Sequence, residues 1–567
     1  MAIIISGNIL INSLLLLALF YYTFSDITVP GENDAFWYDK AYKSIRRAEE
    51  VRGRRCGRSE LRQKAMAKNV ILFLGDGMGM STLAASRILK GQRMNKTGEE
   101  TYLIWENFPN VAFSRTYSTD HQVSDSAGTA TAILCGVKTK MSVIGINDSC
   151  TVKQCDSIER SRITCLSDWF ISQGKSVGFV TNTRITHATP SALYAKSADR
   201  HLEGEKDFAT YKVNRTQEMI EKQSCMDIAW QLVNRFPGNA LKVIMGGGWS
   251  KFLLENQTIN DNYDLSNKAG QRGMMSGDNF GGDVSRPGGN IYDKSPPHLT
   301  GNTCHGCDEI EKKLIVDKSG RKKRSIFKSA IEYKRKMEVG ERKDTNLIND
   351  WINLRKSNGN KYKYVADKYQ LNAVSPQETD YLMGGMIDFA HHEGKARLAL
   401  EETILLDAVV EKVHARITKR GRNVPDDTLL IVTADHSHVF NFGGYPLRGN
   451  PIFRFNKEFP QKPYDVSDVD NLPYTSIVYG NGPGGVDPKK RQHREDLTNV
   501  DTANPDYVAQ AAVPLIRETH GGEDVPIYAI GPGSHLVYGV QEQNYIAHLI
   551  GYSSCVGPYS NGRCRRC

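Results

Sequence analysis

Three short clusters in the sequence combine carboxylates with imidazoles, the side chains that bind zinc in proteins. Asp388 and His392 are four residues apart and would share one face of a helix. Asp435 and His436 directly follow an apolar run, and His520 lies in a polar stretch near the C-terminus. A lone histidine is more often structural, but carboxylates beside imidazoles in separate segments indicate a zinc site.

A glycine-rich turn, Gly75-Asp76-Gly77-Met78-Gly79, follows another apolar run. The acid inside this turn disfavours a dinucleotide-binding loop, because an anion there would repel a pyrophosphate. A carboxylate at the end of a strand suits a hard or borderline cation. We therefore interpret Asp76 as a metal ligand, with a purely structural turn as the alternative.

Ser126 follows Asp125 and opens a helix-like run of small residues. It is either the N-cap of that helix or a nucleophile whose oxygen lies where helix amides and a metal stabilise an anion. No Gly-x-Ser-x-Gly elbow surrounds it, so a Ser-His-Asp hydrolase is disfavoured.

Two zinc ions with three protein ligands each need six donors, and the clusters supply them. Each zinc would keep one position open for substrate or water. The hypothesis assigns Asp388, His392 and His520 to one ion and Asp76, Asp435 and His436 to the other.

Short apolar runs that end in turn residues must position these side chains. Because continuous apolar runs fit strands covered on both faces, they predict an α/β fold with a large, mostly parallel central sheet flanked by helices on both faces. Open α/β sheets carry their sites at the carboxyl ends of the strands. The runs are 69–74, 176–180, 241–245, 428–432 and 525–530.

The composition is that of a folded globular protein. The chain has 567 residues, of which 40% are hydrophobic and 24% charged, which excludes disorder, collagen and coiled coil. The net charge of +9 is confined to residues 312–343, where 13 Lys or Arg face 4 Asp or Glu. Since the remainder is balanced, no nucleic-acid partner is expected.

A long surface insertion is expected at about residues 253–341, inside one catalytic domain spanning 50–567. It is rich in Gly, Asn and Asp and then basic. Cys304 and Cys307 form a lone CxxC motif, for which a disulfide or no role is favoured over half a zinc site. The RKKRS run at 321–325 is either a protease-processing site or a solvated loop.

Residues 1–25 predict entry into the secretory pathway. The run 9–22 is apolar enough for a signal peptide, although the preceding residues lack Lys and Arg, so an N-terminal anchor or a buried segment is the alternative. Secretion makes disulfides the default state of the eleven cysteines. It would also make glycan acceptors of four sequons, at Asn95, Asn147, Asn214 and Asn256.

Five stretches in this order resemble the animal alkaline phosphatases. The resemblance implies phosphomonoester hydrolysis of small substrates by a homodimer that is extracellular or at the cell surface. The matching stretches are Leu74–Gly79, Asp125–Thr131, Asp388–Glu393, Thr433–His438 with Phe442–Arg448, and Glu518–His520.

The same resemblance assigns roles to individual residues. Ser126 takes the phosphoryl group in the Asp125-Ser126 context, and Arg200 holds the phosphate, with a surface salt bridge as the alternative for that arginine. A third metal, magnesium, is bound by Asp76, by Thr189 and by a glutamate, with His187 nearby.

The cysteines and the C-terminus also compare with the family. Disulfides are implied between Cys155 and Cys225 and between Cys555 and Cys564, while Cys135 matches a position that is usually unpaired. Relatives often end in a hydrophobic tail for a lipid anchor, whereas this sequence ends in Arg and Cys. We therefore expect no lipid-anchor signal in this chain.

The sequence departs from the family at Met383, which stands where the magnesium glutamate is expected. Several dozen residues expected between Met383 and Gly385, including most of one strand, are absent. A thioether cannot replace a carboxylate on Mg²⁺, so the third site should be weak or empty. The alternatives are a catalytically impaired glycoprotein, an imperfect gene model, or a phosphodiesterase of the wider superfamily.

Overall fold

The computed structural model describes residues 32–53, 66–255, 257, 340–358, 386–418, 424–486, 493–561 and 564. Several sequence predictions lie outside them: the segment 1–25, Asn256, Cys304, Cys307 and Met383. The chain divides into two units, Met1–Lys251 with Asp367–Cys567, and Phe252–Ala366. In the second unit the structure describes α13, Leu347–Ser357, and two short bridges between residues 254–255 and 340–342.

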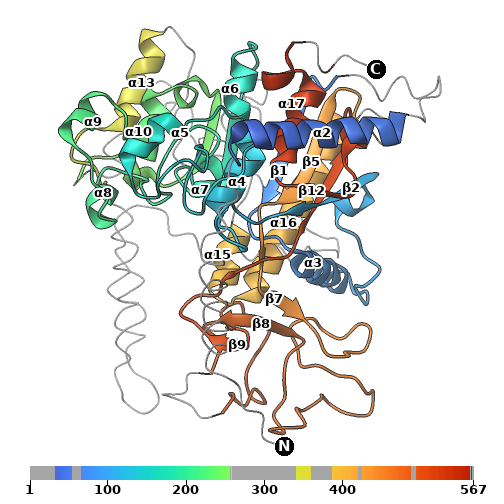
Figure 1. Cartoon of the computed structure of the whole chain (residues 1–567). Coiled ribbons are helices and arrows are strands. Elements are labelled where there is room, and N and C mark those ends of the chain that lie inside the picture. The colour runs from blue at the N-terminus through green and yellow to red at the C-terminus, as the bar shows by residue number, and fades with distance from the viewer. Residues whose placement is uncertain are drawn as a thin grey trace, which may run out of the picture. The chain divides into compact units, whose positions relative to one another are not determined.

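The main sheet of the first unit has five strands in the order β1-β5-β11-β2-β12 (Figure 1). β1–β5 and β2–β12 are parallel, whereas β5–β11 and β11–β2 are antiparallel. The α/β class is confirmed, but this sheet is mixed, because apolar runs predict burial and not direction. The strands are β1 (Asn69–Gly75), β2 (Asn110–Arg115), β5 (Thr428–Ala434), β11 (Val525–Ile530) and β12 (Val540–Glu542).

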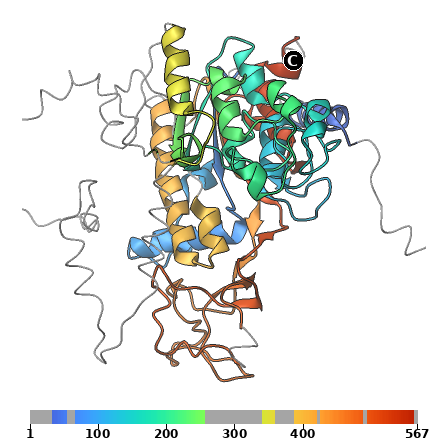
Figure 2. The same cartoon turned by 90° about the vertical axis from the view of Figure 1, so that its left-hand side faces the viewer.

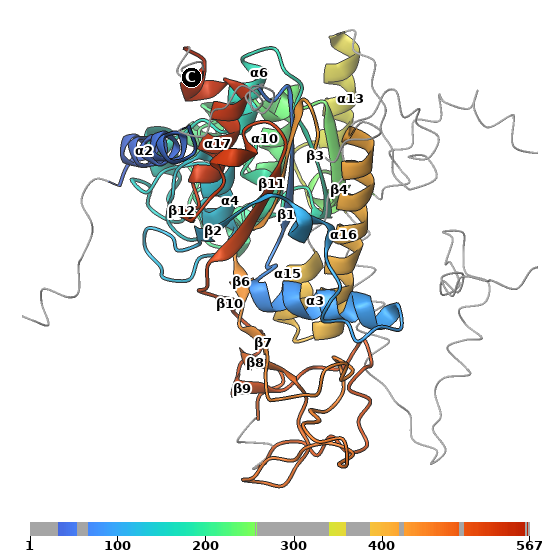
Figure 3. The same cartoon turned by 90° about the vertical axis from the view of Figure 1, so that its right-hand side faces the viewer.

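Helices cover both faces of this sheet, with α16 on one side and α4 and α17 on the other (Figure 3). α16 (Ala396–Ile417) buries Ala399, Leu406 and Val410, spaced to form one apolar face against the strands. α15 (Met386–His392) packs beside it (Figure 2). This packing fixes the helix that carries Asp388 and His392.

The helices on the opposite face of the sheet are α2 (Asp34–Gly53), α4 (Ser126–Cys135) and α17 (Tyr545–Ser554). Trp37 of α2 is fully buried, so the packed unit extends before the expected boundary at residue 50. The side-chain amide of Asn544 donates hydrogen bonds to the Trp37 and Gly136 carbonyls, at 3.0 and 3.1 Å.

β3 (Gly178–Arg184) and β4 (Val243–Gly247) form a separate parallel pair. Both strands and the first half of β1 are only half-buried, whereas β5 and β11 are buried throughout. Among the described strands, β1 pairs with β5 alone.

Two small sheets lie beyond the main one. β6 (Ser437–His438) pairs with β10 (His520–Gly521), and β7 (Phe440–Phe442), β8 (Ile477–Gly482) and β9 (Ala511–Pro514) form a three-stranded sheet. Among the described residues, the remaining α-helices of the first unit are α3 (Met80–Arg93), α5 (Ile158–Ser161), α6 (Leu166–Ile171), α7 (Ala188–Ser191), α8 (Asp207–Thr210), α9 (Gln217–Glu221) and α10 (Ile228–Asn234). Within the described ranges, no helix has the length and apolar character needed to cross a membrane.

The structure pairs Cys155 with Cys225 and Cys555 with Cys564, the two pairs that the family resemblance implied. It also pairs Cys135 with Cys165, so the expectation that Cys135 is unpaired is wrong. Cys135 ends α4 and Cys165 precedes α6, and both are buried in one apolar cluster. Their contact depends on how the two helices pack.

Candidate active site

Ser126 is the first residue of α4, and its N-cap is Asp125. The Asp125 carboxylate accepts hydrogen bonds from the Gly128 and Ser142 amides, both at 3.1 Å. The interpretation of Ser126 as the helix N-cap is therefore wrong, and the Ser126 hydroxyl can make other contacts. Small side chains let this helix pack inside the protein until Gly136, at φ 74°, ends it.

Arg200 is held from two sides. Its Nη1 donates to Asp125 Oδ2 at 2.9 Å, and its Nη2 lies 3.2 Å from His187 Nε2. Burial and the Arg200 charge lower the pKa of His187 to about 3, so the imidazole is neutral and accepts from Arg200. Burial alone would raise the pKa of Asp125, but the Arg200 charge and the hydrogen bonds from the Ser142 and Gly128 amides together lower it. Arg200 is thus an oriented internal cation.

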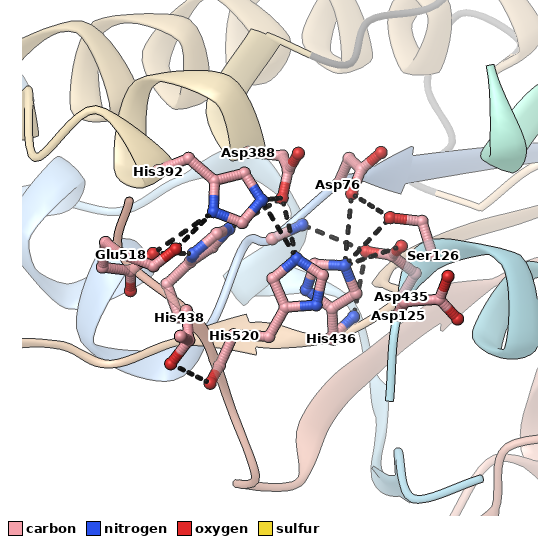
Figure 4. A network of polar contacts seen from close by, with 12 residues as sticks. Asp76, Asp125, Ser126, Asp388, His392, Asp435, His436, His438, Glu518 and His520 are labelled. Atoms are coloured by element: carbon pink, nitrogen blue, oxygen red, sulfur yellow. Dashed lines mark hydrogen bonds and ion pairs between the residues drawn. The ribbon is translucent and has the colours of Figure 1, made fainter. Parts of the chain in front are cut away.

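Asp388, His392 and His520 converge at one point (Figure 4). Asp388 Oδ1 lies 3.4 Å from both His392 Nε2 and His520 Nε2, and the two Nε2 atoms are 3.2 Å apart. A tetrahedral zinc with bonds of about 2.0–2.1 Å brings its donors about 3.3 Å apart. The separations of these three atoms therefore fit one zinc ion. We call Asp388, His392 and His520 the first metal group.

A second metal group comprises Asp76, Asp435 and His436, whose ligand atoms also converge. His436 Nε2 lies 3.5 Å from Asp76 Oδ1 and 3.3 Å from Asp435 Oδ2. Ser126 Oγ lies 3.1 Å from His436 Nε2 and 3.3 Å from Asp76 Oδ1. The serine oxygen thus occupies a fourth position beside three candidate ligands.

The electrostatics of these groups suit cations. Burial and the neighbouring carboxylates raise the pKa of Asp76, and burial raises that of Asp435. Burial also lowers the pKa of His392 to about 4 and that of His436 well below its usual value. Crowded carboxylates beside neutral imidazoles form a site that binds metal ions favourably.

Comparison with known proteins decides the family. The family model for alkaline phosphatase matches residues 67–278 and 383–556. The mouse tissue-nonspecific alkaline phosphatase is 41% identical over 87% of this chain and 84% of its own length. The chain belongs to the alkaline phosphatase family. It is a phosphatase, a hydrolase that acts on phosphomonoesters.

Two further relatives, from chicken and cod, agree with this assignment. The chicken tissue-nonspecific isozyme is 40% identical over 92% of this chain and 90% of its own length, and the cod alkaline phosphatase 36% over 92% and 97%. The solved alkaline phosphatase of the Antarctic bacterium TAB5 is 19% identical, with a TM-score of 0.42 over 87% of this chain and 99% of its own.

Two of the ligands expected at the third metal site, Asp76 and Thr189, lie together. Thr189 Oγ1 donates to Asp76 Oδ2 at 2.8 Å. Asp76 also belongs to the second metal group. His187 contacts Arg200 instead, and its ring lies 5.6 Å from that of Phe389.

Two residues of this site were missing from the sequence-based ligand set. His438 Nε2 lies 3.0 Å from Asp388 Oδ1, and its Nδ1 lies 2.6 Å from Glu518 Oε2. A signal did exist, since each residue stands two positions from a proposed ligand, His436 or His520, and alternate residues of an extended chain share a face.

The sequons also differ in their surroundings. Asn95 and Asn214 are exposed, whereas Asn147 is buried and its Oδ1 accepts hydrogen bonds from Ser149.

Proposed function

We propose that this phosphatase acts through a phosphoserine at Ser126, with zinc ions at the two metal groups. The observation that carries the proposal is the position of Ser126 Oγ, 3.1 Å from His436 Nε2 and 3.3 Å from Asp76 Oδ1. A hydroxyl at this point adjoins both the candidate ligands and the N-terminus of α4, where an oxyanion is stabilised.

The protein's own residues divide the reaction between them. Arg200, held by Asp125 and His187, has further N–H donors for the phosphate oxygens. Ser126 Oγ attacks phosphorus, the alcohol oxygen leaves, and water then hydrolyses the phosphoserine to release phosphate. When bound, zinc stabilises the serine alkoxide and lowers the pKa of its water to about 7. Because these contacts address the phosphate, we expect a broad substrate range.

The test is hydrolysis of p-nitrophenyl phosphate at alkaline pH. Ser126→Ala should abolish turnover and phosphoserine labelling while two zinc ions remain bound. Ser86→Ala is the matched control, since Ser86 is another buried serine, whose Oγ donates to the Leu400 carbonyl at 3.5 Å. Wild-type turnover in Ser126→Ala would overturn the serine assignment.

Magnesium at the third position should bind weakly. Asp76 and Thr189 are the family-matched ligands within the described residues, and the expected glutamate is Met383 in the sequence. We expect elemental analysis of the purified protein to find two zinc ions per chain and less than one magnesium. Stoichiometric magnesium would contradict this expectation.

A second candidate function is a non-catalytic, zinc-binding glycoprotein. The half-buried β1, β3 and β4 favour it, since among the described strands the β3–β4 pair forms a sheet separate from that of β1. A protein with two bound zinc ions and no turnover of p-nitrophenyl phosphate would support this alternative.

We further propose a homodimer outside the cell. Apolar side chains are exposed on and beside the edge strand β9, with Val513 53% and Ile516 97% exposed, and Tyr445 is 80% exposed. The three disulfides among the described residues favour an oxidising compartment. Light scattering coupled to gel filtration should give twice the chain mass, and a monomer would exclude the dimer.

A further inference from the structure

Glu518 joins the segments that carry the first metal group. Its Oε2 lies 2.6 Å from His438 Nδ1, and its Oε1 accepts from the Val439 amide at 2.8 Å. The backbone amide of Glu518 donates to the His392 carbonyl at 3.0 Å, and the backbone carbonyl of Glu518 lies 2.6 Å from His392 Nδ1. One residue therefore contacts α15 through its backbone and the β6 segment through its side chain.

The side-chain contacts form a chain that ends on a proposed ligand. His438 lies between two carboxylates, with Nδ1 toward Glu518 and Nε2 toward Asp388 Oδ1 at 3.0 Å. All three residues are at most 3% exposed. His438 therefore bridges two buried carboxylates, one through each ring nitrogen.

The bonds leave Asp388 little freedom. Glu518 fixes the imidazole of His438, and this imidazole fixes the Asp388 oxygen that faces His392 and His520. Groups that orient a metal ligand in this way commonly change metal affinity 10–100-fold when they are removed.

We propose that Glu518 is a positioning residue for the first metal group, acting through His438 on Asp388. This inference rests on the proposed function, because it assumes that the first metal group binds zinc. It predicts that the Glu518 carboxylate controls the affinity of one of the two zinc ions and leaves the other unchanged.

Glu518→Gln isolates the carboxylate. The variant keeps the side-chain volume and both backbone contacts with His392. Its amide has one oxygen for two donors, the Val439 amide and His438 Nδ1, and it carries no charge to pair with His438. Glu523→Gln is the matched control, because Glu523 is an exposed acid five residues away in the same segment.

The experiment is a zinc titration of the metal-stripped full-length protein against a chromophoric chelator. In Glu518→Gln, one binding step should weaken about 10–100-fold, as in other such sites, and the other should be unchanged. Saturating zinc should restore much of kcat/KM for p-nitrophenyl phosphate. Glu523→Gln should bind both ions as the wild type does. Two wild-type affinities in Glu518→Gln would overturn the inference, and so would equal weakening of both steps.

A double-mutant cycle with His438→Gln tests whether Glu518 acts on the metal group through His438. The cycle can also be run with a second variant of Glu518 if the first one folds poorly. If Glu518 acts through His438, Glu518→Gln should add little to the zinc loss of His438→Gln, whereas additive losses would overturn the route. Should Glu518→Gln fail to fold, Glu518→Asp replaces it in the cycle, with the same outcomes. Wild-type protein that binds two zinc ions without turnover would refute the proposed function, yet the affinity comparison would still decide the role of Glu518.

Discussion

Gly77 packs directly against the ring that orients Asp388, and this contact makes Gly77→Ala a sharp test of the site. A Cβ at this position would lie 2.4 Å from His438 Nε2 and 3.3 Å from the Asp388 Cα. Since ordinary contacts of this kind are about 3.5 Å or longer, the ring must move by about 1 Å. That movement breaks the 3.0 Å contact between His438 and Asp388.

Two costs add in this variant. Gly77 has φ +74°, where a side chain costs about 1–2 kcal/mol. Loss of a charge-assisted hydrogen bond costs about 1.5–3 kcal/mol more. We therefore expect the free energy of unfolding to fall by roughly 3–5 kcal/mol. A ligand displaced by about 1 Å should lower kcat/KM by about 100-fold.

Two glycines provide matched controls, measured by denaturant unfolding and p-nitrophenyl phosphate hydrolysis. Gly174 has φ +72° with nothing within 4 Å of a Cβ, so Gly174→Ala should incur only the backbone cost. Gly443 has neither feature, and Gly443→Ala should match the wild type in both assays. The reasoning fails if Gly77→Ala is no less stable than Gly174→Ala and keeps wild-type kcat/KM.

Arg200→Lys removes the planar guanidinium group that can bind two phosphate oxygens at once, so kcat/KM should fall about 10–100-fold and phosphate should inhibit more weakly. Unchanged phosphate inhibition would contradict this prediction. Burial lowers the pKa of His548 from 6.5 to about 4. The neutral, buried His548 therefore leaves the folded state at full stability above pH 6.5, and the folded state loses stability as the pH falls toward 4. The loss is about 3 kcal/mol. His548→Gln should therefore flatten the acid side of the Tm profile, and an unchanged profile would refute this. If the protein is secreted, mass spectrometry should find glycans at Asn95 and Asn214 but not at the buried Asn147; full occupancy of Asn147 would contradict its burial.

Much of the site was predictable because its signals are local. The i,i+4 spacing of Asp388 and His392 matches one face of α15, and the small residues after Asp125 form the buried α4. The apolar runs also became strands near their expected positions. A residue's spacing and its immediate neighbours are sufficient for each of these predictions.

The contacts between distant segments were decided only by the tertiary structure. No local pattern specifies that β11 runs antiparallel to β5, that Cys135 meets Cys165, or that His438 stands between Asp388 and Glu518. Each depends on how elements far apart in the chain pack. The amino-acid types selected the chemistry, and packing set the donor separations of a few ångströms on which metal binding depends.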